Sequence, residues 1–355
     1  MRTSLVVNTS RFRHNIRSIR EQLAPQTLFL AVVKADAYGH GAAELAKVAE
    51  DEKVDYFGVA TVDEAVELRE TGIVTPILML TEPTDVDRVQ AVLYYNITLS
   101  VYTQSFLADL SKMAAKFGKP ARVHLKVDTG MSRVGVDPDD VLPMVDLISR
   151  NPYLQLEGVF SHFSDADGTD DTYSRLQMDR FKKVTISLKR HHYNVAIYHI
   201  ANSAATLRYP ESHYNMVRVG IALYKGVLTF ATRVIHVKTL PADTPIGYGK
   251  TYITPNAMRI AVLSVGYADG YSRLLSGKGE VLIHGRRCPL VGRVCMDMTT
   301  VAIPDDLVVN QGDAVTLIGA EGDELISAES IANRTQTIDY EVMCSIGKRV
   351  PRLYR

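Results

Sequence analysis

A lysine stands where a buried strand is expected to end. Lys34 follows the apolar run at residues 29–33, and Tyr38 and the stretch Gly39–Gly41 come after it. A lysine at the carboxyl end of a buried strand can be desolvated, which lowers the pKa of its amine and frees it for Schiff-base chemistry. Strand-end lysines also simply extend into water, so this interpretation depends on other polar residues sharing the site.

Further polar segments follow other expected strands. They are Asp128-Thr129-Gly130-Met131-Ser132-Arg133, His162, Asn202-Ser203 and Arg218-Val219-Gly220-Ile221. In a barrel of parallel strands the active site lies at the carboxyl ends, so these residues would share one rim with Lys34. Loops after the last two barrel strands often bind phosphate through backbone N–H groups and a hydroxyl, which suits Ser203 and the Gly220 and Ile221 amides. The residues alone indicate an enzyme that uses a lysine and a phosphate-bearing ligand.

The elements that must position these residues alternate between strand-length apolar runs and helical patterns. An amphipathic helix is expected first, because Phe12, Ile16, Ile19 and Leu23 recur at helical spacing. Strands are expected at residues 27–33, 55–60, 76–80, 97–101, 121–127, 156–161, 196–200 and 215–219. Helical stretches, such as Ala42/Leu45/Ala46/Ala49 and residues 173–188, lie between them.

This alternation predicts a (β/α)8 TIM-like barrel over residues 1–225. An open doubly wound sheet would show the same alternation, although no Gly-x-Gly-x-x-Gly turn follows the first strand, which weakens its dinucleotide-binding version. From residue 226 to residue 355 a mostly β domain is expected. Its strands are expected at residues 233–239, 259–265, 279–284, 290–303 and 313–319, with short helices at 327–334 and 338–346.

Composition narrows the class of protein. The 355 residues contain 40 Lys plus Arg and 40 Asp plus Glu, so no basic footprint suggests nucleic acid. The first residues lack the apolar core of a signal peptide, and no apolar run is long enough to span a bilayer. Cys288, Cys295 and Cys344 are too few and too dispersed for a disulfide framework. We therefore expect a cytoplasmic protein without a membrane or nucleic-acid partner.

Several segments resemble the alanine racemase family over nearly the whole chain. They are residues 29–41 around Lys34, Asp128–Arg133, Ala201–Ala205, Arg218–Tyr224, Gly266–Gly270, Val291–Asp297 and Tyr340–Cys344. The resemblance implies a pyridoxal 5′-phosphate enzyme that interconverts L-alanine and D-alanine by a two-base mechanism and supplies D-alanine for peptidoglycan. It also implies a head-to-tail homodimer.

The resemblance further implies a role for each matching residue. Lys34 would hold the cofactor as a Schiff base and act as one base, while Tyr248, the second base, would enter the site of the partner subunit. The cofactor residues would be Lys34, Tyr38, His162, Asn202, Ser203, Arg218, Gly220, Ile221 and Tyr340. Arg133 and Met296 would bind the substrate carboxylate. His199 and Lys126 would support the site, and Lys126 matches a lysine that carries a carbamate in some members. Tyr267 would narrow the entrance together with Tyr340, and Asp167, Arg273 and Arg293 would lie farther out.

Two positions depart from the family pattern. Gly247 precedes Tyr248 where serine is common, and Lys225 follows Tyr224 where glycine is usual. No metal is expected. The acidic stretch from Asp165 lacks glycine at the sixth position of a calcium loop and has Leu176 where the bidentate glutamate belongs, and His284, Cys288 and Cys295 lack the usual zinc spacing. Two other functions remain open: a different pyridoxal-phosphate barrel enzyme, such as a decarboxylase or a broader racemase, and a non-catalytic carrier of the cofactor.

Overall fold

The computed structural model describes residues 2–85 and 88–355. They divide into two compact units. The barrel unit contains the described residues of Arg13–Ala37 and Ala42–Leu223, and the β unit contains those of Met1–Phe12, Tyr38–Gly41 and Tyr224–Arg355. No helix in these ranges is long and apolar enough to cross a membrane.

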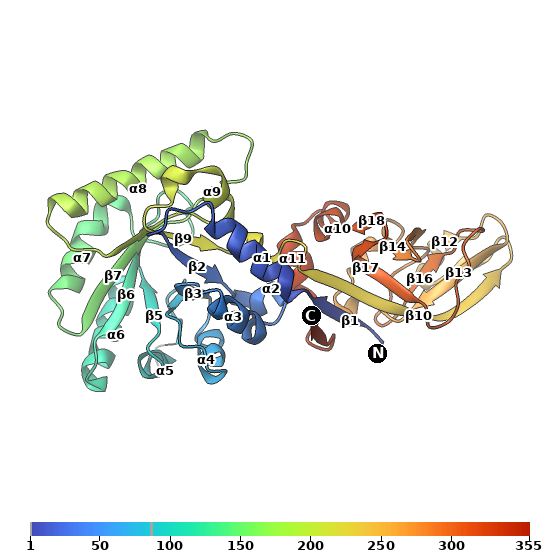
Figure 1. Cartoon of the computed structure of the whole chain (residues 1–355), viewed down its shortest axis with the longest axis horizontal. Coiled ribbons are helices and arrows are strands. Elements are labelled where there is room, and N and C mark those ends of the chain that lie inside the picture. The colour runs from blue at the N-terminus through green and yellow to red at the C-terminus, as the bar shows by residue number, and fades with distance from the viewer. Residues whose placement is uncertain (1, 86–87) are drawn as a thin grey trace. The chain divides into compact units, whose positions relative to one another are not determined.

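Parallel strands form the sheet of the barrel unit (Figure 1). They are β2 (Leu28–Val32), β3 (Tyr56–Val59), β4 (Ile77–Met79), β5 (Thr98–Val101), β6 (Ala121–Lys126), β7 (Leu154–Phe160), β8 (Ile197–His199) and β9 (Met216–Val219). Their order is β8-β7-β6-β5-β4-β3-β2-β9. Each strand falls on an expected apolar run, and the predicted TIM-like barrel is confirmed.

The barrel closes between β8 and β9 through hydrogen bonds outside the regular ladder. The Arg218 N–H donates to the Ala201 carbonyl at 2.9 Å, and the Tyr198 N–H donates to the Asn215 side chain at 2.6 Å. The seam is therefore held by residues at the ends of both strands, and Arg218, on β9, is fixed directly beside the loop that follows β8.

The helices of this part of the chain lie around the strands in Figure 1. They are α1 (Thr9–Arg20), α2 (Lys34–Gly39), α3 (Ala42–Asp51), α4 (Val62–Glu70), α5 (Val89–Tyr94), α6 (Gln104–Phe117), α7 (Val141–Ser149), α8 (Thr172–Arg190) and α9 (Ser203–Arg208). The amphipathic opening helix is confirmed, although α1 ends before Leu23. The buried face of α3 consists of the expected Ala42, Leu45, Ala46 and Ala49.

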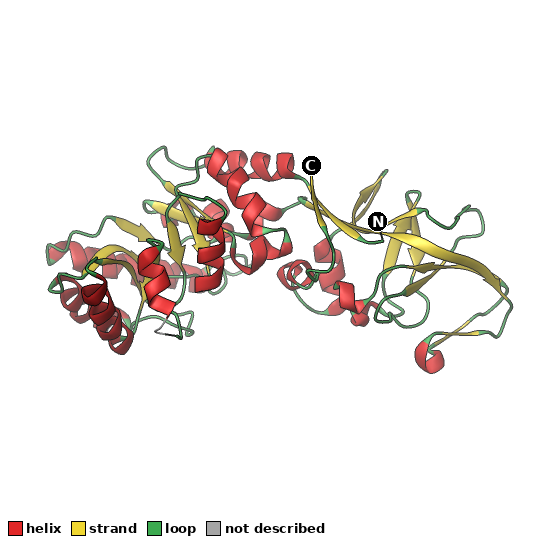
Figure 2. Ribbon diagram, turned by 90° about the horizontal axis from the view of Figure 1, so that it is seen from below, coloured by secondary structure: helices red, strands yellow, loops and turns green. Residues whose placement is uncertain are grey.

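The second unit is mostly β, as predicted, and its strands are yellow in Figure 2. They are β1 (Ser4–Val7), β10 (Leu228–Leu240), β11 (Pro245–Ile246), β12 (Tyr252–Ile253), β13 (Met258–Leu263), β14 (Glu280–Ile283), β15 (Arg286–Pro289), β16 (Thr299–Ala302), β17 (Ala314–Glu321), β18 (Glu324–Ile326) and β19 (Arg352–Tyr354). Its short helices are α10 (Ala328–Thr335) and α11 (Asp339–Cys344).

The strand expected at 290–303 is confirmed only near its end, because β15 ends at Pro289 and β16 covers Thr299–Ala302. The chain between them turns at Gly292, whose φ is +76°. The strand β1 was not expected, yet it pairs antiparallel with β10 and parallel with β19.

Candidate active site

The segment after β2 carries Lys34 into a left-handed turn. Ala35, Asp36, Ala37 and Tyr38 have φ values of +52°, +54°, +52° and +55°. The Ala37 N–H still donates to the Val33 carbonyl at 2.8 Å, so α2 is a helical turn of the opposite hand. L-residues adopt this conformation at a cost of about 1–2 kcal/mol each, so surrounding contacts must hold the turn in place.

The Glu64 carboxylate supplies such contacts. It accepts hydrogen bonds from the N–H groups of Ala35 at 2.8 Å, Ala60 at 2.7 Å and Thr61 at 3.3 Å. Glu64 is also the third residue of α4, and with Thr61 it forms the capping box of that helix. One carboxylate thus joins the residue after Lys34 to the start of α4.

Replacing Glu64 with glutamine should lower the free energy of unfolding by about 1–3 kcal/mol, because backbone donors lose a charged acceptor. Urea denaturation of the full-length protein measures this change. Glu67→Gln, on the exposed side of the same helix, is the matched control and should be nearly neutral. Equal stability of the two variants would show that Glu64 does not hold the turn.

Positive side chains gather at the carboxyl-terminal rim of the barrel. Burial first, and then the neighbouring Arg218, Arg133 and Lys34, lower the pKa of Lys126 to about 8, while Asp128 acts in the opposite direction. Burial and the same cations, with Lys126 among them, hold the pKa of His162 well below its usual range. The rim therefore brings together several residues singled out from the sequence, and its charge favours anions.

Arg218 is the buried centre of this cluster. Its guanidinium donates to His199 Nδ1 at 2.9 Å, to His162 Nδ1 at 3.0 Å and to the carbonyls of Ser161 at 2.7 Å and Ile200 at 3.1 Å. Burial lowers the pKa of Arg218 to about 9, which leaves the guanidinium positively charged at neutral pH. Because arginine can only donate hydrogen bonds, both imidazoles must accept from it.

The loops after β8 and β9 meet at a serine hydroxyl. Ser203 Oγ accepts from the N–H of Gly220 at 2.8 Å and from the N–H of Ala222 at 3.3 Å, on either side of Ile221. Asn202 Oδ1 caps α9 by accepting from the Ala205 N–H at 3.0 Å. A hydroxyl and backbone N–H groups converge here in the manner of the phosphate sites of barrel enzymes.

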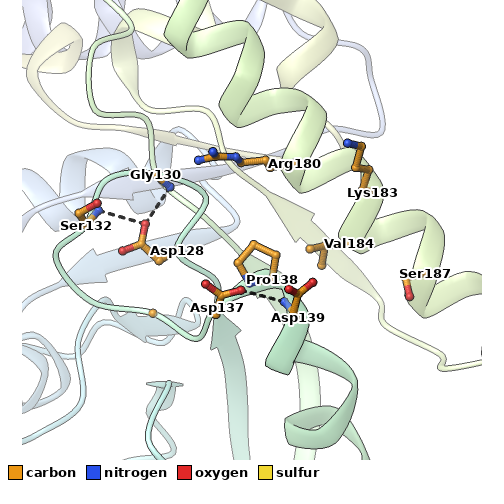
Figure 3. Close-up of a pocket in the computed structure, with 11 residues that line it drawn as sticks. Asp128, Gly130, Ser132, Asp137, Pro138, Asp139, Arg180, Lys183, Val184 and Ser187 are labelled. Carbon is orange, nitrogen blue, oxygen red and sulfur yellow. Dashed lines mark hydrogen bonds between the residues drawn. The ribbon is translucent and has the colours of Figure 1, made fainter.

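The loop that leads to Arg133 is shaped by Asp128. Asp128 Oδ1 accepts from the N–H groups of Gly130 at 2.8 Å and Ser132 at 3.1 Å (Figure 3). Arg180, on α8, donates to the Thr129 carbonyl at 3.0 Å. A hollow of about 720 Å³ lies between this loop, the turn at residues 137–139 and α8. These contacts fix the loop from its α8 side.

In the β unit, Tyr38 lies among aromatic rings. Its ring centroid is 4.7 Å from that of Tyr224 and 5.8 Å from that of Tyr340. Burial raises the pKa of the Tyr38 hydroxyl, so this group stays protonated and able to donate. Gly39 permits the close approach of α11, because a Cβ there would lie 2.5 Å from the Met343 carbonyl oxygen.

The remaining residues singled out from the sequence lie elsewhere in the β unit. Tyr248 begins the short 3-10 turn Tyr248–Lys250, and its side chain is 73% exposed. Gly247 has φ +69° and ψ −168°, a conformation essentially confined to glycine, so Gly247 shapes the loop that carries Tyr248. Tyr267 and Met296 are both exposed and lie in adjacent segments, joined by the bond from the Tyr267 N–H to the Cys295 carbonyl at 3.0 Å.

Two polar residues that connect to Arg218 through His199 were not singled out from the sequence: the buried His124 and the partly buried Glu157. His124 Nδ1 lies 2.8 Å from His199 Nε2, and His124 Nε2 lies 3.2 Å from Glu157 Oε2. The sequence contained a signal for His124. It lies two residues before Lys126, so both side chains lie on the same face of a strand whose other residues are mostly apolar. Glu157 gave no signal.

Comparison with known proteins gives matches over the full chain. The family model described as alanine racemase, N-terminal domain, matches residues 7–227, and the alanine racemase, C-terminal domain, matches residues 227–354. Alanine racemase 2 of Oceanobacillus iheyensis is 39% identical, with 98% of this chain and 92% of that protein covered. The alanine racemase of Symbiobacterium thermophilum is 42% identical, with 98% and 96% covered.

Solved structures give a similar result. The alanine racemase of Clostridium difficile has a TM-score of 0.95 and 36% identity, with 100% of this chain and 96% of that chain covered. The alanine racemase of Bacillus anthracis with bound L-Ala-P has a TM-score of 0.93 and 34% identity, with 99% and 95% covered.

Proposed function

The chain belongs to the alanine racemase family, and we propose that it interconverts L-alanine and D-alanine with pyridoxal 5′-phosphate, using Lys34 and Tyr248 as its two bases. The observation that carries this proposal is the grouping of Lys34, Arg133 and Arg218 around Lys126 on one barrel rim. This arrangement joins an amine able to form a Schiff base to cations able to hold anionic groups.

The donor chemistry of the rim fits pyridoxal phosphate. Ser203 and the N–H groups of Gly220 and Ile221, with Tyr38, Asn202 and Tyr340, are assigned to the phosphate side, and His162 to the ring oxygen. When bound, the cofactor supplies an electron sink that weakens the bond from the substrate's α-carbon to its hydrogen. Lys34 is assigned as its covalent anchor.

Inverting the α-carbon requires a proton to leave one face and another to arrive at the opposite face. We assign the D-face proton to the amine of Lys34 and the L-face proton to the hydroxyl of Tyr248. The exposed ring of Tyr248 supports its assignment to the partner subunit's site within a homodimer. Arg133 and the Met296 N–H are assigned to bind the substrate carboxylate. Tyr267 and Tyr340 are assigned to narrow the entrance to the site. We assign the D-alanine product to peptidoglycan, on the resemblance described above.

The first experiment is incubation of the full-length protein with L-alanine and pyridoxal phosphate in heavy water. Optical rotation and deuterium at the α-carbon are followed together. Loss of rotation with incorporation of deuterium is the expected result. Exchange with retained rotation would contradict the two-base assignment, and the absence of both changes would contradict alanine as the substrate.

Lys126 should form a carbamate. Burial and the neighbouring Arg218, Arg133 and Lys34 lower the pKa of Lys126 to about 8. The fraction of Lys126 in the neutral amine form therefore increases as the pH rises from about 6 to about 9. That amine adds to carbon dioxide and releases a proton to water, which places an anion among the three cations. Carbon-13 NMR with labelled bicarbonate should show a carbamate signal that is lost in Lys126→Ala. A signal that persists in this variant, or none at all near pH 9, would contradict the assignment.

A further inference from the structure

A line of hydrogen-bonded side chains crosses the interior of the barrel unit behind Arg218. The guanidinium lies 2.9 Å from His199 Nδ1, and His199 Nε2 lies 2.8 Å from His124 Nδ1. At the far end, His124 Nε2 lies 3.2 Å from Glu157 Oε2. Both histidines are fully buried, whereas the Glu157 side chain retains 14% exposure. The line therefore joins the cationic rim to a carboxylate at the edge of the interior.

Two backbone features place the far end of this line. Val123 pairs with Leu156 and His124 pairs with Gly158, so Glu157 is an extra residue in β7. A bulge of this kind redirects side chains out of the regular alternation, and here it accompanies the contact from Glu157 to His124. A Cβ at Gly158 would lie 2.6 Å from Cε1 and Nδ1 of His124, so glycine leaves the room that the ring occupies.

The chemistry of the groups fixes the direction of every hydrogen bond. Arg218 can only donate, so His199 accepts at Nδ1 and carries its proton on Nε2. That proton is donated to His124 Nδ1, which leaves the His124 proton on Nε2 to be donated to Glu157. Burial lowers the pKa of both His124 and His199, in keeping with one proton on each ring.

The line also links the buried positive charge of Arg218 to a negative charge. The other groups that accept from Arg218 are the carbonyls of Ser161 and Ile200 and the imidazole of His162, none of which carries a negative charge. An uncompensated buried charge is costly. The Glu157 carboxylate supplies negative charge at the end of the line, and it is itself bonded by Thr98 at 3.1 Å and by Arg122 at 3.4 Å.

We propose that Glu157 and His124 are positioning residues for Arg218: the carboxylate holds the His124 ring by accepting its Nε2–H, and the two imidazoles together hold the guanidinium in one orientation. Neither residue is assigned to touch the substrate or the cofactor. Their effect on catalysis rests on the proposed racemase function, whereas the hydrogen bond from His124 to Glu157 does not.

Glu157→Gln tests the proposal because it keeps the shape of the side chain and removes its charge. Nitrogen-15 NMR of the full-length protein, labelled at its histidines and free of added cofactor and substrate, reports which ring nitrogen carries each proton. Both His124 and His199 should show a protonated Nε2 in the unaltered protein. In the variant the Nε2–H resonance of His124 should move upfield, because its acceptor is no longer charged and the hydrogen bond weakens. The kcat for alanine should fall by about 10-fold, as for partners that orient active-site groups, while KM changes little.

Arg122→Gln is the matched control, because Arg122 contacts Glu157 but neither imidazole. It should leave the His124 Nε2–H resonance and kcat nearly unchanged. Gly158→Ala is a second test, because it displaces the His124 ring without changing any charge, and it should reproduce the effects of Glu157→Gln. Gly158→Ala also decides the proposal if Glu157→Gln does not fold.

An unchanged His124 Nε2–H resonance in both Glu157→Gln and Gly158→Ala would overturn the proposal. An altered resonance with unchanged kcat would overturn the catalytic role of the line. If the unaltered protein fails to racemise alanine, the proposed function fails, and the NMR spectra still decide whether Glu157 holds the His124 ring.

Discussion

Tyr248→Phe should lower the rate of alanine racemisation by about 100- to 10,000-fold, the range that positioned general acids and bases contribute. The substitution removes the hydroxyl assigned to the L-face proton and leaves the aromatic ring in place. Exchange of the α-hydrogen of L-alanine into heavy water should almost cease. Binding of pyridoxal phosphate, measured from its absorption spectrum, should be unaffected, because Lys34 and the phosphate residues are unchanged.

The neighbouring Tyr252 provides a matched control. It lies on β12, and its hydroxyl is 3.8 Å from the Met258 sulfur, within the β unit. Tyr252→Phe removes a hydroxyl from the same part of the chain and should leave racemisation nearly unchanged. Near-normal activity of Tyr248→Phe, or equal losses in both variants, would refute the assignment of Tyr248 as a base.

Arg218→Glu should change the course of the reaction as well as its rate. Pyridoxal enzymes that place a carboxylate at the pyridine nitrogen keep it protonated and stabilise a long-lived carbanion. The resemblance to alanine racemases would place Arg218 at that nitrogen instead. Because arginine can only donate hydrogen bonds, the nitrogen would stay unprotonated and a carbanion would be stabilised less. The variant should lose at least about 100-fold in kcat and show new long-wavelength absorption with alanine. It should also form pyruvate by transamination.

Arg218→Lys separates the loss of charge from the loss of geometry. It keeps the positive charge but cannot maintain all the bonds to His199, His162 and the carbonyls of Ser161 and Ile200. This variant should lose activity without the new absorption band and without pyruvate. An unchanged spectrum of a folded Arg218→Glu with alanine, or equal pyruvate formation by both variants, would contradict the role given to Arg218.

Barrel topology could be predicted from the sequence because each strand is a short apolar run between helical patterns. Once the barrel is assumed, residues at the strand ends, such as Lys34, His162 and Ser203, fall on one rim without further information. The β unit was harder, because its partners are distant along the chain: Leu5 pairs with Phe230 and with Arg352. Val291 and Val294 made a loop resemble a strand, since both are buried outside a regular ladder.

Other parts of the site depend on geometry that one sequence does not encode locally. The left-handed conformation of Ala35–Tyr38 has no signal in residues that ordinarily favour the right-handed region. The contact of Glu157 with His124 depends on the register between β6 and β7, where one extra residue alters the alternation. Such features follow from pairing between strands, and an isolated segment gives no indication of them.

The left-handed turn has a consequence for the order of folding. A run of L-residues in this conformation is unfavourable on its own, so it cannot serve as a local nucleus for the chain. Two hydrogen bonds hold the turn: the Ala35 N–H donates to Glu64, and the Ala42 N–H donates to Asp36, each at 2.8 Å. These bonds can form only when the neighbouring elements have assembled. Lys34 should therefore gain its final direction late, after the surrounding strands have paired, and a nascent barrel would acquire the capacity to bind the proposed cofactor only at a late step of folding.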